Sequence, residues 1–109
     1  MSHGFIGVLV ADLRLEMSES LKDKRRALQR LRAELVKATG ASVTESDAHD
    51  RLRRAELTIA VTSRDAHGVS GLLDDAERVI GRGPFDTVGA DRAIRSAREI
   101  IEEGETWHA

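Results

Sequence analysis

The stretch Phe5–Glu16, FIGVLVADLRLE, decides the fold of this chain of 109 residues. From Gly7 onward, one set of side chains is apolar and the alternate set is more polar. This is the period-two pattern of a long strand with one buried face. Ile6 and Val8 add apolar side chains to the other face at the start of the strand. The stretch therefore predicts a central strand, or an edge strand that a partner covers.

Two amphipathic helices are predicted around this strand. The first covers Leu21–Thr39, with Ser18 and Ser20 as N-cap candidates and Gly40 at its C-terminal end. Its apolar positions are spaced seven, three and four residues apart. This spacing places four leucines on one stripe of the helix: Leu21, Leu28, Leu31 and Leu35. The second helix is capped by Asp65 and stops at Gly81. Its apolar stripe consists of Val69, Leu72, Leu73, Ala76, Val79 and Ile80.

Three further strands complete the predicted order βαββαβ. They cover Ala41–Ser46, Ala55–Ser63 and Phe85–Arg92, whereas Ala93–Glu103 keeps helical spacing. Right-handed crossovers and a strand-to-strand link in the middle then give a ferredoxin-like α+β sandwich. We expect a four-stranded antiparallel sheet with both helices on one face. The predicted division is a lead-in or tag remnant at 1–4, the domain at 5–92, and a C-terminal extension with helical spacing at 93–109, whose last residues, 105–109, we expect to be frayed.

The composition favours one folded domain of intracellular type. Apolar residues make up 40% of the chain and charged residues 33%, and there is no cysteine, which excludes disulfides, thiolate metal sites and thiol nucleophiles. The longest apolar stretch, Phe5–Ala11, is too short to span a membrane, and no leader pattern follows the start. We expect a cytoplasmic protein. No phosphate loop, nucleophile elbow or zinc-protease motif occurs, so no catalytic residue, metal ligand or cofactor is predicted.

The predicted sheet has one face that no helix covers. On the first strand this face includes Ile6, Val8 and Val10, which is more apolar than a solvated sheet usually is. The sequence therefore predicts a homodimer that forms through the open face of the sheet.

Several stretches resemble a known family. Phe5-Ile6-Gly7-Val8-Leu9, Ser20-Leu21-Lys22-Asp23-Lys24-Arg25-Arg26 and Arg54-Ala55-Glu56-Leu57 occur in the order and spacing of the DUF503 family, also called YlxP-like. The resemblance covers roughly residues 5–92 and implies a ferredoxin-like fold. It implies no established activity, but bacterial members often have genes beside translation-initiation and ribosome-maturation factors. The chain departs from the family pattern at Val88–Asp91, which is less apolar than the usual last strand.

Positive charge is concentrated in the first helix. The net charge of the chain is only −2, yet residues 18–40 carry seven lysines and arginines against three carboxylates. A helix N-terminus with added basic side chains can hold phosphate groups. The alternative is that these are ordinary solvated residues of an amphipathic helix, some of which form ion pairs with Asp23 and Glu34. The predicted phosphate contacts are Lys22, Lys24, Arg25, Arg26, Arg30, Arg51, Arg53 and Arg54, and Arg32 lies on the same helix.

Three functional hypotheses follow. The first is a small non-enzymatic module that binds RNA or the ribosome through the first helix; with few aromatic residues, it would contact phosphates rather than stack bases. The second is a regulatory homodimer that docks an acidic protein partner. The third is an enzyme in which Asp47, His49 and Asp50 act with His67, although an Asp-x-His-Asp loop is more typical of turn chemistry. We expect no enzyme, and the third hypothesis fails if the two histidines lie far apart.

Overall fold

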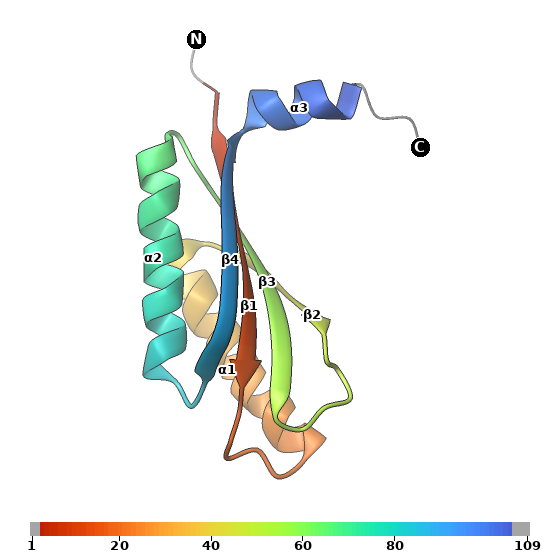
Figure 1. Cartoon of the computed structure of the whole chain (residues 1–109). Helices are drawn as coiled ribbons and strands as arrows, with labels where there is room; N and C mark the ends of the chain where they lie inside the picture. The colour runs from red at the N-terminus through yellow and green to blue at the C-terminus, as the bar shows by residue number, and fades with distance from the viewer. Residues whose placement is uncertain (1–2, 106–109) are drawn as a thin grey trace.

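The computed structural model describes residues 3–105 and confirms the ferredoxin-like fold. The elements are β1 (Phe5–Arg14), α1 (Leu21–Thr39), β2 (Ser42–Asp47), β3 (Arg54–Ser63), α2 (Ala66–Arg82), β4 (Asp86–Ser96) and α3 (Ala97–Glu105). The strands form one sheet in the order β2-β3-β1-β4, and every neighbouring pair is antiparallel. Strand β1 is therefore a central strand, which pairs with β3 on one side and β4 on the other (Figure 1).

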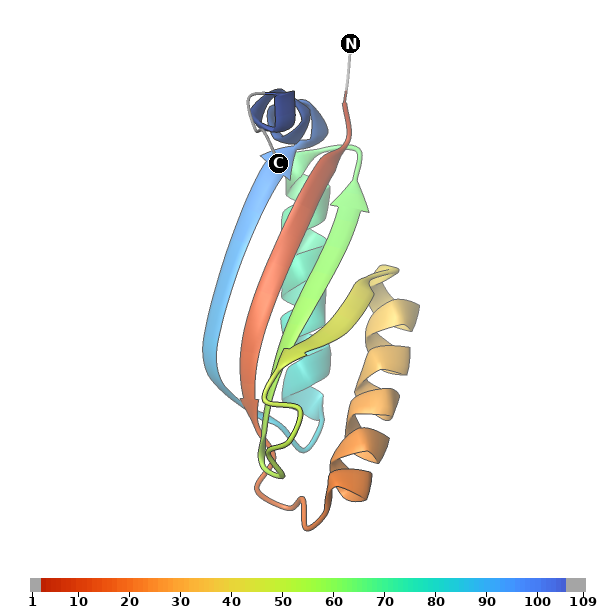
Figure 2. The same ribbon diagram turned by 90° about the vertical axis from the view of Figure 1, so that its right-hand side faces the viewer.

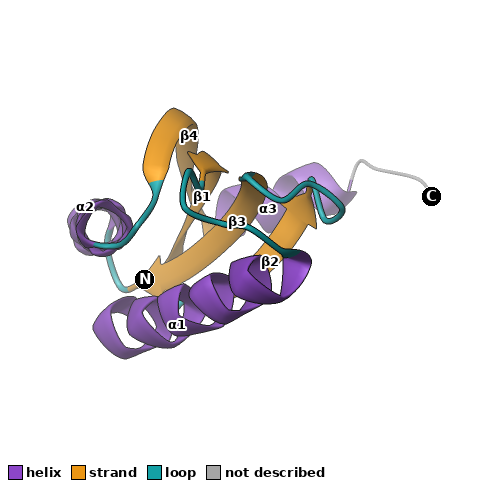
Figure 3. Cartoon of the chain, turned by 90° about the horizontal axis from the view of Figure 1, so that it is seen from below, coloured by secondary structure: helices purple, strands orange, loops and turns teal. Residues whose placement is uncertain are grey.

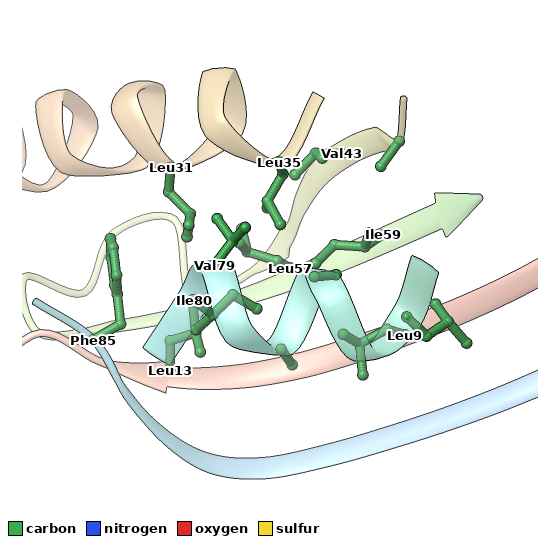
Figure 4. Close-up of a cluster of buried hydrophobic side chains, with 14 of the residues drawn as sticks. Leu9, Leu13, Leu31, Leu35, Val43, Leu57, Ile59, Val79, Ile80 and Phe85 are labelled. Carbon is green, nitrogen blue, oxygen red and sulfur yellow. The ribbon is translucent and has the colours of Figure 1, made fainter. Parts of the chain in front are cut away.

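Helices α1 and α2 lie side by side on one face of the sheet (Figures 1 and 3). The core lies between this helical layer and the sheet, where inward-facing side chains of β1 and β3 meet the apolar stripes of both helices (Figure 4). Its fully buried members include Leu9, Leu13, Leu35, Ile59, Val69, Leu73, Val79 and Ile80. The alternating burial along β1 and β3 follows directly from the period-two pattern in the sequence.

Strand β4 is longer than predicted. It reaches Ser96 because it pairs along the whole of β1, with Arg95 opposite Ile6 and Ser96 opposite Phe5. Residues 93–96, which the sequence placed in the extension, therefore belong to the sheet. Only the following segment, Ala97–Glu105, is helical. The ladder with β1 outweighs the helical spacing of residues 93–96, since local propensity is a weak signal beside strand pairing.

Helix α3 projects from the end of β4 on the side of the sheet opposite α1 and α2 (Figures 1 and 2). The N-terminal segment contacts its start: the Ala97 N–H donates to the Gly4 carbonyl at 2.8 Å, and Arg98 Nε donates to His3 Nε2 at 2.9 Å. Residues 3 and 4 therefore have structural contacts that the predicted lead-in lacked. The predicted fraying of the last residues concerns mainly 106–109, which lie outside the described residues. Among the helices of residues 3–105, none has the length and apolar character needed to cross a bilayer.

A capping box begins α3. The Ser96 N–H donates to Glu99 Oε1 at 3.1 Å, and the Glu99 N–H donates to Ser96 Oγ at 3.0 Å. Both bonds lower the pKa of Glu99 below its ordinary value, and the bond from the Ser96 backbone has the larger effect. The sequence signal was available in the four residues Ser96-Ala97-Arg98-Glu99.

We expect α3 to lose helicity in acid, because a carboxyl whose pKa is lowered on folding stabilises only while ionised. The contribution is complete above the ordinary glutamate pKa of about 4.3 and disappears as the pH falls through the lower folded value. Backbone chemical shifts of residues 97–103 followed during acidification measure this loss. The variant Glu99→Gln keeps an acceptor but cannot titrate, so its shifts should move less; equal movement in both proteins would contradict the prediction.

Candidate nucleic-acid interface

Helix α1 positions the predicted phosphate-binding residues. Ser20 caps the helix by accepting the Asp23 N–H on its Oγ at 3.0 Å, and Gly40 ends it with a φ of 69°. Leu31 and Leu35 are buried in the core. Because these leucines fix which side of α1 faces the sheet, the polar side of the helix is left in solvent.

Five basic side chains share this solvent-exposed side, which we call the basic face: Lys22, Arg25, Arg26, Arg30 and Arg32. Within residues 3–105 none of the five forms an ion pair, including with Asp23 or Glu34 on the same helix. The alternative, in which Asp23 and Glu34 form ion pairs with these basic side chains, therefore does not occur in this structure. Asp23 lines one surface cavity with Arg26 and Arg30, and Glu34 lines another with Arg30, so the basic face is positive in excess although carboxylates lie near it.

Lys24 does not belong to the basic face. Its side chain is buried, with 1% of the residue exposed, and its Nζ lies 2.8 Å from Glu45 Oε2. The same nitrogen donates to the Ala48 carbonyl at 2.5 Å and to the His49 carbonyl at 3.5 Å. Lys24 thus joins α1 to β2 and to the loop that follows it. The structure removes this residue from the predicted contacts, because a buried amine with three oxygen partners cannot reach a ligand.

The predicted apolar stripe of α1 changes accordingly. Leu21 is 39% exposed, and Lys24 occupies the buried position one turn before Leu28. The spacing of Lys24, Leu28, Leu31 and Leu35 is four, three and four, which is the pattern of one helical face. This signal was present in the sequence, but a lysine in an apolar stripe is rarely buried without a partner.

The three arginines at and before the start of β3, Arg51, Arg53 and Arg54, divide into two groups. Arg54 pairs with Asp12 on β1 at 2.8 Å between Nη2 and Oδ2. Arg51 and Arg54 line an open cavity of about 420 Å³ whose other charged residues are Asp12, Asp47, Asp50 and Glu56. Carboxylates outnumber arginines there, so this cavity does not attract phosphate. Arg51 and Arg53 are both exposed and without an ion pair in the described part of the chain, but Arg53 does not line this acidic cavity and is therefore the better placed of the two to meet an anion.

A groove runs beside the basic face, between α1 and the connection from α2 to β4. One part, of about 360 Å³, is lined by Arg26, Arg30 and Pro84 among others; the adjoining part, of about 330 Å³, is lined by Arg30, Arg82 and Pro84. Arg30 therefore faces both parts. Arg82 was missed by the sequence analysis because it lies far along the chain from α1, and only the packing of α1 beside α2 brings it to the groove.

The two histidines of the enzyme hypothesis lie at opposite ends of the sheet. His49 belongs to the loop that leads into β3, whereas His67 lies in the first turn of α2, just after β3 ends (Figure 1). Ten residues of extended strand separate these ends, a span of about 30 Å. Within the described residues no group of three histidines or carboxylates could hold a metal ion. His49 and His67 therefore do not form one site, and the third hypothesis, which requires it, is dropped.

The family is established by sequence. Residues 6–94 match the family model described as "Protein of unknown function (DUF503)". This match covers most of the chain, so the protein belongs to the DUF503 family, as the motifs of β1 and α1 indicated.

Solved structures of similar shape are distant in sequence. A structural-genomics protein, YJCS, has 11% identity and a TM-score of 0.46 over 81% of this chain and 96% of its own. A putative antibiotic biosynthesis monooxygenase from Bacillus cereus has 10% identity and a TM-score of 0.44 over 88% and 94%. The designed protein Foldit4 has 16% identity and a TM-score of 0.46 over 85% and 96%. None of these similarities carries an inference about function. No curated protein matches the chain.

Proposed function

We propose that this protein is a small non-enzymatic module that binds structured RNA, alone or within the ribosome, through the basic face of α1. The observation that carries the proposal is the set of five lysines and arginines that are spread over the solvent-exposed half of α1 without an ion pair in residues 3–105. Regularly spaced phosphates are the ligand that such a surface holds best, because each contact releases condensed counterions. A cytoplasmic location, where RNA is present, accords with this function.

The proposed contact is with the backbone of RNA rather than with its bases. Modules that read single strands on a sheet stack bases on aromatic side chains. Here the open face of the two central strands carries Val8, Val10, Thr58 and Ala60, and no aromatic residue. The groove beside α1 adds Arg82 to the basic face, so a phosphate chain that follows the groove would touch two elements. Such binding depends on shape and charge more than on sequence.

Neutralising three residues of the basic face, Arg25→Gln with Arg26→Gln and Arg30→Gln, is expected to weaken binding to an RNA hairpin at low salt by roughly 10- to 100-fold. It should also reduce the slope of log affinity against log salt by about 2 to 3, since each lost phosphate contact removes nearly one unit. A salt series by fluorescence anisotropy measures both quantities. The matched control changes Arg64, Arg78 and Arg98 to glutamine, which alters the net charge equally but leaves α1 intact.

Two results would count against RNA as the ligand. One is the absence of binding by the unmodified protein at low salt, and the other is equal affinity in the triple variant and its control. If the basic face instead docks an acidic protein, a pulldown with the native protein should return one protein partner that persists after nuclease treatment and is lost in the triple variant.

A further inference from the structure

Within residues 3–105 no helix or strand lies over the face of the sheet opposite α1 and α2, and we call this face the open face (Figure 2). Strand register places Arg95, Ala93 and Asp91 of β4 beside Ile6, Val8 and Val10 of β1 on this face. On the other side of β1, the register adds Thr62, Ala60 and Thr58 of β3. The centre of the open face is therefore apolar, with charged residues around it.

Charges of opposite sign lie on either side of this apolar centre along β4. Arg95 and Asp91 are both exposed and flank Ala93. They are four residues apart, or about 13 Å along the strand, which is too far for an ion pair with each other. Within the described residues neither Asp91 nor Arg95 has an ion pair; Arg95 donates to the neighbouring Ile94 carbonyl at 3.0 Å, and its positive charge also acts on the Glu99 carboxylate of α3. Each is thus available to a group outside its own chain.

Helix α3 borders the open face at one end. It projects outward from the end of β4, and its nine residues span about 13 Å (Figures 1 and 2). Two sheets that pack face to face are about 10 Å apart, so α3 is long enough to reach across such a gap. Its isoleucines Ile100 and Ile101 are 40% and 61% exposed. A body that covers the open face would therefore meet apolar side chains at that end as well.

We propose that a second copy of this chain covers the open face, with the two β4 strands antiparallel and Arg95 of each protomer opposite the partner's Asp91. The two-fold axis of this dimer lies between the two sheets, runs perpendicular to the strands and passes beside the pair Val8 and Ala93. Rotation about this axis places Arg95 of one protomer opposite Asp91 of the other. This places two ion pairs around a shared apolar centre. The surface is self-complementary, as a two-fold interface requires.

The alternative two-fold axis, parallel to the strands, does not use these charges. It would set β4 against the partner's β3 at the same level, so that Arg95 would face threonine Thr62 rather than a carboxylate. It would also bring both α3 helices to the same end of the dimer. In the antiparallel arrangement each α3 instead reaches the free end of the other sheet, where Asp12 and Glu56 lie.

The size of the open face makes α3 a necessary part of this interface. Strands about 4.8 Å apart, with about 3.3 Å per residue, give the open face roughly 500 Å². Stable interfaces bury about 800 Å² per partner. The exposed isoleucines of α3, which follows directly on β4, add apolar surface at that end of the sheet. The inference is independent of RNA binding, because α1 lies on the opposite side of the sheet.

Sedimentation equilibrium of the full chain at micromolar concentration tests the proposal, and a dimer is expected. The single variants Arg95→Glu and Asp91→Arg should each weaken dimerisation at least 10-fold, because each sets like charges opposite each other. The double variant, Arg95→Glu with Asp91→Arg, should restore the dimer, since it exchanges the two signs. Both sites are exposed on the edge strand β4, and unchanged circular dichroism confirms that the three variants fold.

A monomer in the unmodified protein would overturn the proposal, and would leave the open face to a different partner. A dimer whose affinity is the same in both single variants would overturn it too, because the interface would then lie elsewhere or use the parallel axis. A dimer weakened in the single variants and equally weak in the double variant would contradict the opposition of Arg95 and Asp91.

Discussion

Replacing Lys24 with alanine is expected to destabilise the protein by about 3–5 kcal/mol, the usual cost of removing one partner from a buried ion pair. The Lys24 ammonium lies 2.8 Å from Glu45, whose side chain is only 22% exposed. In Lys24→Ala this carboxylate loses its counter-charge, and the Ala48 carbonyl loses its donor. A chemical denaturation curve gives the change in the free energy of unfolding.

Lys22→Ala is the matched control, because Lys22 lies half a turn away on the same helix, is exposed and has no ion pair in the described part of the chain. Its cost should stay within about 0.5 kcal/mol. The double variant, Lys24→Met with Glu45→Leu, removes both charges and should recover much of the loss. If Lys24→Ala unfolds at the same denaturant concentration as the Lys22 control, the proposed link between α1 and β2 contributes no stability.

Adding one methyl group at Gly7 is expected to cost about 1–3 kcal/mol through overpacking. Gly7 lies on the inward face of β1, where α2 packs closely. A Cβ atom there would collide with Val69 Cγ1 and come within 3.0 Å of Leu73 Cδ1. Val69 and Leu73 are fully buried, so neither can move aside without displacing α2. The loss in Gly7→Ala should appear in thermal and chemical unfolding alike.

Gly71→Ala makes the same chemical change in a different environment. Gly71 lies inside α2 with nothing within 4 Å of an added Cβ. Since alanine is the better helix former, this variant should gain about 0.5–1 kcal/mol. Opposite signs in the two variants would show that close contact, and not the loss of a glycine as such, sets the cost at position 7.

The fold could be predicted because each long element carries its own period in the sequence. The alternation in β1 and β3 and the stripe of α2 were sufficient to give the order of elements and the layers. Strand β4 was harder: most of its residues are exposed, so no alternation marks its end, and pairing with β1 decides its length. Boundaries that depend on a distant strand are not readable from local pattern.

The candidate site was predicted as a group but not residue by residue. The exposed positions of the basic face follow from helical spacing alone. The fate of Lys24 depends on Glu45, twenty-one positions further along, and that of Arg54 on Asp12, forty-two positions earlier. Arg82 reaches the groove only through the packing of two helices. Charge pairing across long separations requires tertiary geometry, which a count of lysines and arginines does not contain.

Helix α3 is less stable than the rest of the fold because of its position. It packs mainly on β4, and its start is bonded to Gly4 and His3 rather than to the core. A segment with so few buried contacts opens without disturbing the rest of the molecule. Its amide hydrogens should therefore exchange with deuterated solvent much faster than those of β1, and limited proteolysis should cut there first. Slower exchange in α3 at higher protein concentration would report its burial against a neighbouring molecule.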